Sequence, residues 1–187
     1  MKEQLKAGDI GLHKGSALTS KIIEWFMKSY AKKLGIKNPR LFSHTFMLID
    51  VWGQLYIAEA DDTGINIRPF IGSDYDKDRS TWISKTPIKP YSKDEKDTVS
   101  KAAMNCTFNP TRYDFFGLIY QIGKIVRAKN TTEEHWGGPT GEKSERRMYC
   151  SEAVANWSND VRPNTFPTPW SMNPLDVDLN KYYRDMV

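Results

Sequence analysis

The sequence predicts an α+β fold for this chain on three observations. Consecutive β-rich runs are joined by short turns, which is typical of antiparallel strands. Amphipathic segments, with apolar residues every three or four positions, lie before and after these runs and predict helices that pack against a sheet. The chain has 187 residues, no internal repeat and no convincing domain boundary. Residues 1–187 are therefore expected to form a single domain with its own core.

The first half of the chain is expected to supply one helix and most of the strands. In chain order, the expected elements are a strand over Ala7–Leu12, a helix over Leu18–Leu34, and strands over Phe42–Val51, Gln54–Ala60, Gly64–Pro69 and Ser80–Lys89. Ser16 or Thr19 is the expected N-cap of the helix, and Gly35 is expected to end it because glycine readily adopts the left-handed conformation. Asp74–Arg79 is expected to be a charged loop.

The second half of the chain is expected to be mainly helical. The expected helices are one that begins after Ser92 and runs through Cys106, a second over Phe115–Ile125 and a third over Cys150–Asn159. Ser92 and Glu95 have the spacing of a capping box, which supports the first of these helices. Residues 127–147 predict a long polar loop, of the kind that is often a lid or disordered. The proline-rich residues 162–174 are expected to be ordered coil if Phe166 and Trp170 reach the core.

The chain carries a formal net charge of +4, and much of the excess lies in one region. The lysine and arginine residues from Lys28 to Arg40 have no acidic neighbour between Glu24 and Asp50 in the sequence. They form either a solvated helix face and loop, or a surface that attracts an anionic polymer or membrane. No aromatic stacking motif or zinc-finger spacing accompanies them, so a nucleic-acid partner is not expected.

The cysteine content and the lack of long apolar runs indicate the cellular compartment in which the protein is expected. The two cysteines are too few for a disulfide framework in a small domain and suit a reducing compartment. The polar N-terminus lacks the apolar run of a signal peptide, and no stretch approaches the ~18 apolar residues of a membrane span. We therefore expect a cytoplasmic protein without a transmembrane segment, although export by a holin or by phage lysis would leave no such trace.

Cys150 is the strongest candidate for a catalytic residue. A cysteine hydrolase needs a thiolate, a base beside it and a group that holds the base. Cys150 stands at the predicted start of a helix, where unpaired N–H groups and the helix dipole favour a thiolate, whereas Cys106 stands near the end of its helix. The alternative is a buried core cysteine, because Cys150 shares one helix face with Ala153, Val154 and Trp157.

Three histidines are candidates for the base. His135 lies in the glycine-rich loop and is most simply a surface residue. His13 follows the first predicted strand and lies either near the site or on an exposed surface. His44 begins an apolar run that ends at Asp50, and it is either the base or a structural residue of the strand.

Glu59 is the candidate for the group that holds the base. A carboxylate inside a β-rich run is unusual without a partner. A two-residue turn at Trp52-Gly53 places Glu59 opposite Phe46, so that His44 lies two positions away on the same face. Such diagonal neighbours are about 7–8 Å apart at the backbone, within reach of these side chains. A three-residue turn would place them on opposite faces, and a surface glutamate on an edge strand is the alternative.

An ordered set of short motifs resembles a known superfamily. The motifs are Gly8-Asp-Ile10, Thr19-Ser-Lys-Ile-Ile23, Phe42-Ser-His-Thr-Phe-Met47, Ile57-Ala-Glu-Ala60 followed by Gly64-Ile65 and Pro69, Tyr113-Asp-Phe115 and Tyr149-Cys-Ser-Glu152. In this order, and over most of the chain, they resemble the permuted branch of the NlpC-type papain-fold superfamily, the YiiX/YebB-like proteins. No single motif is specific, but the ordered set is fairly specific.

The resemblance implies a permuted papain-like fold, in which the histidine strand precedes the cysteine helix. It also implies a half-open antiparallel barrel or sheet packed against helices. In functional terms, it implies Cys150 as the nucleophile, His44 as the base and Glu59 as the residue that orients His44. The loop over residues 127–147 is longer and more polar than the resemblance leads one to expect, which leaves the shape of the substrate cleft open.

These residues predict a cysteine hydrolase that acts by acyl transfer. The resemblance implies an amidase or peptidase acting on peptides or murein fragments of bacterial cell walls. A lipid acyltransferase or thioesterase of the lecithin retinol acyltransferase type is an alternative, and a binding module with an inactive site is a third hypothesis. No cofactor is expected, and Cys150 and His44 without paired Cys or His spacing predict no metal site.

Three aromatic residues are candidates to line the substrate cleft. They are Tyr149, Tyr113 and Trp157. Ordinary packing in the core is the alternative for each of them.

Overall fold

The computed structural model of the protein describes residues 4–108, 112–113, 147–169 and 172–186. Six strands form one antiparallel sheet in the order β4-β3-β2-β1-β5-β8. These strands are β1 (Ile10–His13), β2 (His44–Val51), β3 (Gln54–Asp61), β4 (Gly64–Pro69), β5 (Trp82–Pro87) and β8 (Tyr183–Asp185). Two short strands, β6 (Arg112–Tyr113) and β7 (Arg147–Met148), pair in parallel apart from this sheet.

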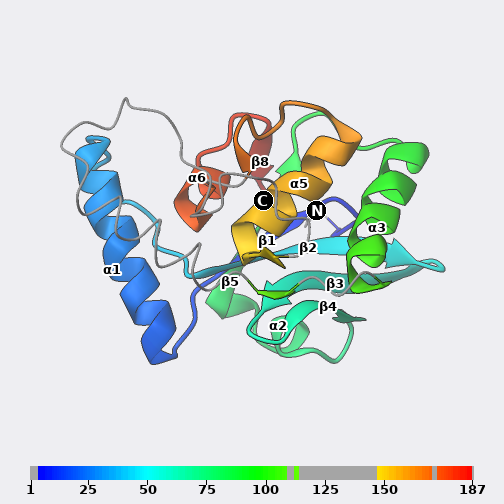
Figure 1. The fold of residues 1–187 in the computed structure, drawn as a ribbon, viewed down its shortest axis with the longest axis horizontal. Coiled ribbons are helices and arrows are strands. Elements are labelled where there is room, and N and C mark those ends of the chain that lie inside the picture. The colour runs from blue at the N-terminus through cyan, green and yellow to red at the C-terminus, as the bar shows by residue number, and fades with distance from the viewer. Residues whose placement is uncertain (1–3, 109–111, 114–146, 170–171, 187) are drawn as a thin grey trace.

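The described helices cover both faces of the sheet (Figure 1). They are α1 (Leu18–Lys33), α2 (Asp74–Lys77), α3 (Lys93–Phe108), α5 (Cys150–Val161) and α6 (Pro174–Asp178), with a 3₁₀ turn over Arg79–Thr81. Helices α3, α5 and α6 lie on one face, α2 lies on the other, and α1 stands at the side of the molecule. The prediction of an α+β fold with an antiparallel sheet packed against helices is therefore confirmed.

The hairpin between β2 and β3 sets the register on which the site depends. Trp52 and Gly53 both have positive φ, 54° and 81°, which is the conformation that two-residue hairpin turns require. Val51 therefore pairs with Gln54, and the pairing continues to Phe46 opposite Glu59. This is the predicted register.

Alternation along the strands divides the core into two clusters. The larger cluster packs Met47, Ile49 and neighbouring strands against α3 and α5, and includes Val99 and Val154. The smaller cluster lies on the other face of the sheet and is largely aromatic. It consists of Phe46, Leu48, Ile57, Phe70, Tyr75 and Trp82, with Leu5 and Leu55 packed against it. Because successive side chains of a strand point to opposite faces, β2, β3 and β5 contribute to both clusters.

Two expectations for the first half of the chain are wrong. Asp74–Arg79 is not a plain charged loop but contains α2, whose first turn is capped by the Ser73 side chain. Burial of Tyr75 against the sheet gives this charged segment the apolar anchor that a short helix needs. Helix α1 begins after Ala17 without a side-chain cap, so neither Ser16 nor Thr19 is its N-cap.

Other boundaries agree with the sequence. Gly35 follows α1 with φ 71°, as expected for a residue that ends a helix. The capping box of α3 is present, because Ser92 and Glu95 exchange side-chain to backbone hydrogen bonds of 2.8 and 3.2 Å. The strand expected over Ala7–Leu12 is displaced toward its C-terminal end, since β1 covers Ile10–His13.

The C-terminal region holds more structure than expected. Residues 162–169 are irregular, as predicted, and Phe166 is fully buried. Helix α6 follows, capped by Asn173, and β8 then joins the sheet beside β5. The helix predicted over Phe115–Ile125 and almost all of the loop predicted over residues 127–147 lie outside the described residues. Among the residues that are described, no helix is long and apolar enough to cross a membrane.

Candidate active site

Cys150 is the first residue of α5, as the sequence predicts. Tyr149 precedes it with extended backbone angles, and the Ala153 N–H donates to the Tyr149 carbonyl to close the first turn. The N–H of Cys150 has no partner within the helix because it belongs to the first turn. The Cys150 side chain is 4% exposed, so the helix dipole acts on the thiol with little screening by water.

His44 lies between Cys150 and Glu59. It is the first residue of β2, and the start of this strand meets the start of α5. The His44 Nε2 is 2.8 Å from Glu59 Oε2, and the His44 side chain also hydrogen-bonds to Cys150. Since Nε2 is engaged by Glu59, Nδ1 is the nitrogen left for the sulfur. The structure thus brings the three predicted residues into one hydrogen-bonded chain.

Glu59 is held by two further side chains. Arg68 on β4 donates through Nε to Glu59 Oε1 over 2.9 Å, and the Tyr75 hydroxyl on α2 donates to Oε2 over 3.1 Å. The carboxylate is 5% exposed, yet each of its oxygens accepts a hydrogen bond. Burial of a carboxylate is tolerated when it is paired and hydrogen-bonded in this way.

Sequence reasoning did not find Arg68 or Tyr75. Arg68 was within its reach, because Asn66 pairs with Glu59 and residues 66 and 68 of a strand share a face. Tyr75 could not be found from the sequence, because no local sequence pattern predicts that α2 packs onto the sheet. Its ring stacks on Phe46 with centroids 4.2 Å apart, and its carbonyl accepts the Trp82 indole N–H.

The protonation states in this chain are coupled. Burial alone would disfavour the charged form of each group, but the hydrogen bonds of His44 to Cys150 and Glu59 outweigh it and raise the pKa of His44 to about 10. Burial likewise opposes ionisation of Cys150, yet His44 and the neighbouring Thr45 lower the pKa of its thiol below the ordinary value. The two shifts together favour the thiolate–imidazolium form of the pair over the neutral form.

Glu59 stays ionised beside this pair. Burial would raise its pKa, but hydrogen bonds and charge interactions with His44 and Arg68 lower it to about 2. The same surroundings have the opposite effect on Tyr75, because burial and the Glu59 charge raise the pKa of its phenol. Tyr75 therefore remains a hydrogen-bond donor to the carboxylate at neutral pH.

His13 lies beside the site. It pairs with His44 across β1 and β2, and its ring meets the Tyr75 ring edge-on with centroids 5.1 Å apart. Burial and the charge of His44 lower its pKa, which favours a neutral imidazole. Of the two positions that the sequence left open for His13, the structure selects the one near the site.

The three aromatic candidates for the substrate cleft differ in where the structure places them. Trp157 is 1% exposed and packs within the main core, where its indole N–H donates to the Cys106 sulfur over 3.5 Å. Core packing was the alternative for Trp157, and its burial in the main core agrees with that alternative. Tyr149 is adjacent to Cys150 and 2% exposed. Of Tyr113, the structure describes the backbone, which pairs with Met148, whereas its side chain and His135 lie outside the described residues.

This architecture is found in a solved structure. The chain is similar in fold to YiiX. The crystal structure of the metalloprotein YiiX from Escherichia coli O157:H7 matches with a TM-score of 0.57, and the match covers 99% of this chain and 98% of YiiX. The identity between the two is 14%, so the likeness concerns the fold alone. No family model and no curated protein sequence matches the chain.

The similarity to the metalloprotein YiiX raises the question of a metal site in this chain. Within the described residues, no group of three histidine, cysteine, aspartate or glutamate side chains is arranged to hold a metal ion. His44 and Glu59 satisfy each other and Arg68 supplies a positive charge next to them, which disfavours a cation there.

Proposed function

We propose that this chain is a cysteine hydrolase with a permuted papain-like fold, in which Cys150 is the nucleophile, His44 the base and Glu59 the residue that orients His44. The observation that carries the proposal is the hydrogen-bonded chain from the Cys150 thiol through His44 to the buried Glu59 carboxylate. A nucleophile, a base and an orienting group in contact are the arrangement that covalent acyl transfer needs.

The reaction begins from the thiolate–imidazolium pair. The Cys150 thiolate attacks the carbonyl carbon of an amide, the C–N bond breaks, and the His44 imidazolium gives its proton to the departing amine. An acyl thioester then joins the substrate to Cys150. Neutral His44 takes a proton from water, the hydroxide attacks the thioester, and release of the carboxylic acid restores the thiolate and the imidazolium.

Two features of the site favour this chemistry. The N–H of Cys150 has no helical partner at the start of α5 and is available to donate to the oxyanion that forms on the substrate carbonyl. Glu59, held by Arg68 and Tyr75, fixes the plane and tautomer of the His44 ring, so that Nδ1 faces the sulfur throughout the cycle.

The substrate that we propose is an amide bond in a cell-wall-type peptide, on the resemblance to the NlpC-type superfamily. Fatty acyl transfer between lipids would use the same thioester chemistry and is the alternative that a substrate screen must separate.

Selective alkylation tests the nucleophile. Iodoacetamide at neutral pH is expected to modify Cys150 well before Cys106, whose pKa is raised by burial. The rate for Cys150 is expected to stay high below the ordinary thiol pKa and to fall only when acid protonates the thiolate. Peptide mass spectrometry after timed quenching measures both rates. Slow modification of both cysteines at equal rates would contradict a tuned thiolate.

Replacement of His44 tests whether it is the base, and replacement of His135 is the matched control. In His44→Ala, the Cys150 rate profile is expected to shift to higher pH, because the imidazolium that lowers the thiol pKa is gone. His135→Ala, at a residue with no proposed role, is expected to leave the profile unchanged. An unchanged profile in His44→Ala would exclude His44 as the partner of the thiol.

A substrate screen then separates the enzyme classes. Incubation with muropeptides and, in parallel, with phospholipids is read by mass spectrometry for peptide cleavage or loss of an acyl chain. Cleavage of a muropeptide by the wild type and not by Cys150→Ala is the expected result. Acyl transfer from a lipid supports the alternative, and a reactive Cys150 that turns over neither class points to a binding module.

A further inference from the structure

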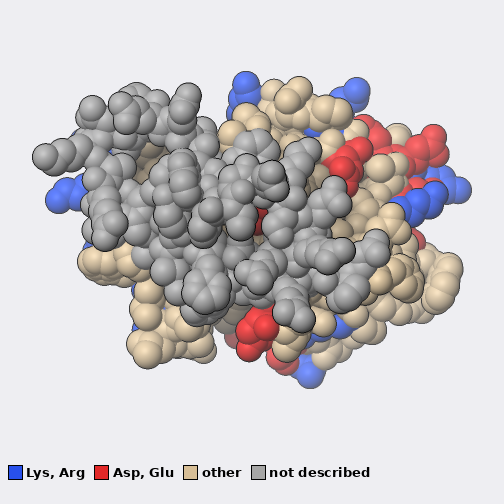
Figure 2. Space-filling model, viewed as in Figure 1, with Lys and Arg blue, Asp and Glu red and all other residues tan. Residues whose placement is uncertain are grey.

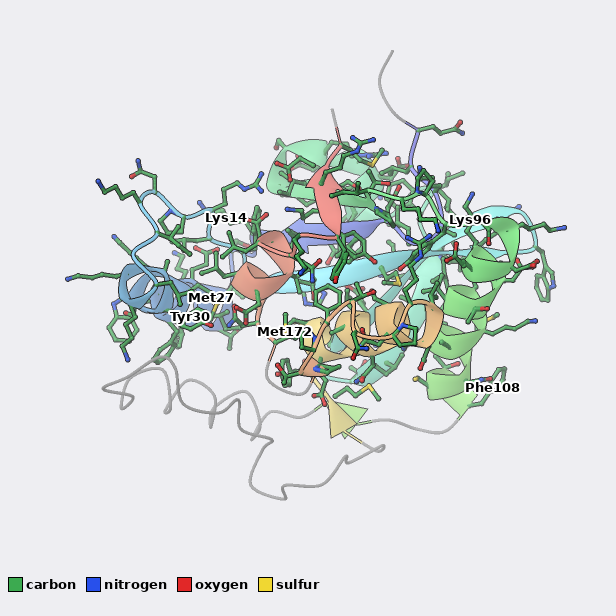
Figure 3. All side chains as sticks on the ribbon, turned by 90° about the horizontal axis from the view of Figure 1, so that it is seen from above. Lys14, Met27, Tyr30, Lys96, Phe108 and Met172 are labelled. Atoms are coloured by element: carbon green, nitrogen blue, oxygen red, sulfur yellow. The ribbon has the colours of Figure 1, made fainter. Side chains whose placement is uncertain are left out.

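Among the described residues, helix α1 packs against the rest of the protein through one side. Met27 and Ala31 are buried there with Leu175 of α6, and Ile23, Phe26 and Tyr30 pack around them. Figure 3 shows Met27 and Tyr30 on the side of α1 next to α6. This contact satisfies one apolar stripe of the helix and fixes its orientation on the molecule.

A second apolar stripe of α1 faces outward. Leu18, Ile22 and Trp25 are 75%, 45% and 60% exposed. They are spaced four and three residues apart, so they lie one above another on one helix face. Scattered exposed apolar residues are ordinary on a protein surface, but a leucine, an isoleucine and a tryptophan that share one helix face are typical of an interaction surface.

The charges of α1 are mostly positive. Lys21 and Lys28 lie one helical turn to either side of Trp25 and are exposed, and Lys32 and Lys33 follow in the last turn. The single acidic residue of α1 is Glu24, and one of its carboxylate oxygens is buried. In Figure 2, the part of α1 that stands clear of grey atoms, at the lower left, carries no acidic atoms.

We propose that this face of α1 docks onto an anionic phospholipid membrane. A helix with a tryptophan and aliphatic side chains on one face, bordered by lysines, lies in the plane of a bilayer interface with its apolar residues among the upper acyl chains. Tryptophan is favoured at that depth. Each lysine near a negatively charged surface adds electrostatic attraction, which is the charge complementarity that selects an anionic lipid as the occupant.

The position of α1 relates the membrane to the candidate active site. Leu18 follows the end of β1, where His13 pairs with His44. The intervening segment is tied to the same place, since the Gly15 N–H donates to the Ser43 side chain over 2.9 Å. Helix α1 is therefore connected to the end of β1 at which His13 lies next to the candidate site. The proposal itself concerns binding and does not depend on the proposed chemistry.

Vesicle flotation tests the docking surface with the intact protein. The wild type is expected to float with vesicles of phosphatidylcholine mixed with phosphatidylglycerol and to stay behind with pure phosphatidylcholine. Added salt is expected to weaken the binding, because it screens charges on exposed lysines. Equal binding to both vesicle types, or binding to neither, would overturn the proposal.

Two pairs of variants locate the contact on α1. Trp25→Ser is expected to reduce binding to the anionic vesicles about tenfold, whereas Trp52→Ser, at a tryptophan that is 97% exposed in a hairpin turn, is expected to leave it unchanged. Lys21→Gln with Lys28→Gln is expected to weaken binding by a similar factor, and Lys93→Gln with Lys101→Gln on α3 serves as the charge-matched control. Equal effects within either pair would show that the contact does not lie on α1.

Discussion

Glu59 is bonded to side chains from three different elements. His44 comes from β2, Arg68 from β4 and Tyr75 from α2, and all three reach one buried carboxylate. A buried charge is stable only while such partners remain, so Glu59 has a structural role in addition to the one proposed for it in orienting His44.

The low pKa of Glu59 makes its contribution to stability dependent on pH. Its folded-state pKa of about 2 lies below the ordinary value of 4.5, so the contribution is full above 4.5 and is lost as pH falls toward 2. Glu59→Gln is expected to lower the free energy of unfolding by about 2 to 3 kcal/mol at pH 7 and by much less near pH 2. Urea unfolding of both proteins at the two pH values measures the difference.

Other acidic groups titrate in both proteins and cancel in that comparison. Asp61→Asn, at the last residue of β3 whose carboxylate accepts from the Thr63 N–H, is the matched control and is expected to give a small change. If Glu59→Gln lowers the free energy of unfolding equally at both pH values, then Glu59 stabilises the protein through its shape and not through its charge.

At the scale of elements, the β2–β3 hairpin determines whether His44 and Glu59 meet. Its turn has two residues, both with positive φ, and this conformation fixes the pairing of Phe46 with Glu59. Tryptophan is unusual at the first of these positions, where asparagine or glycine is preferred. The exposed Trp52 side chain gains nothing from burial, so the turn is held by its neighbours and not by its own preference.

Gly53→Ala isolates this conformational requirement. An added Cβ at Gly53 would meet no atom within 4 Å, so the effect comes from the backbone angle of φ 81° alone. We expect a loss of about 1 kcal/mol in the free energy of unfolding. Trp52→Asn is expected to change stability in the opposite direction, because asparagine tolerates positive φ. Chemical denaturation of the two variants tests both signs, and a stabilising Gly53→Ala would contradict this account.

Over the whole molecule, a buried ion cluster joins distant segments. Lys85 on β5 and Asp178 on α6 are 5% and 4% exposed, and the Lys85 Nζ lies 3.2 Å from the Asp178 carboxylate. Arg40, before β2, bonds to Asp178 and to Asp185 on β8. The cluster holds α6 and β8 against the sheet, next to the segment that precedes His44.

Removal of Asp178 is expected to be strongly destabilising. Asp178→Ala removes the buried carboxylate partner of Lys85 and leaves only the half-exposed Asp185, 3.4 Å away, so we expect a loss of about 3 kcal/mol from the poorly compensated buried charge. Asp185→Ala is the matched control, since Asp185 is 49% exposed and is expected to contribute less than about 1 kcal/mol. Lys85→Met combined with Asp178→Leu is expected to recover much of the loss, as measured by urea unfolding. Similar losses in the two single variants would contradict this explanation.

The sequence predicts the elements of the site better than their surroundings. The helix start at Cys150, the two-residue turn and the register of Glu59 are local properties, and all three agree with the structure. The burial of Trp157 was left open by the sequence, because an aromatic on the apolar face of a helix has the same pattern in a core and in a cleft. The helix over residues 74–77 was missed because its stability comes from Tyr75 packing on the sheet.

The sequence by itself determined the parts of this protein that depend on neighbours along the chain. These are the periodicity of its helices and strands, the hairpin parity that puts His44 and Glu59 on one face, and the position of Cys150 at a helix start. The tertiary structure alone decided that the helix start meets the strand start, that Arg68 and Tyr75 enclose Glu59, and that β8 closes the sheet beside β5. The physical reason is that contacts between distant segments depend on how the elements pack in three dimensions. A local sequence pattern does not specify that packing.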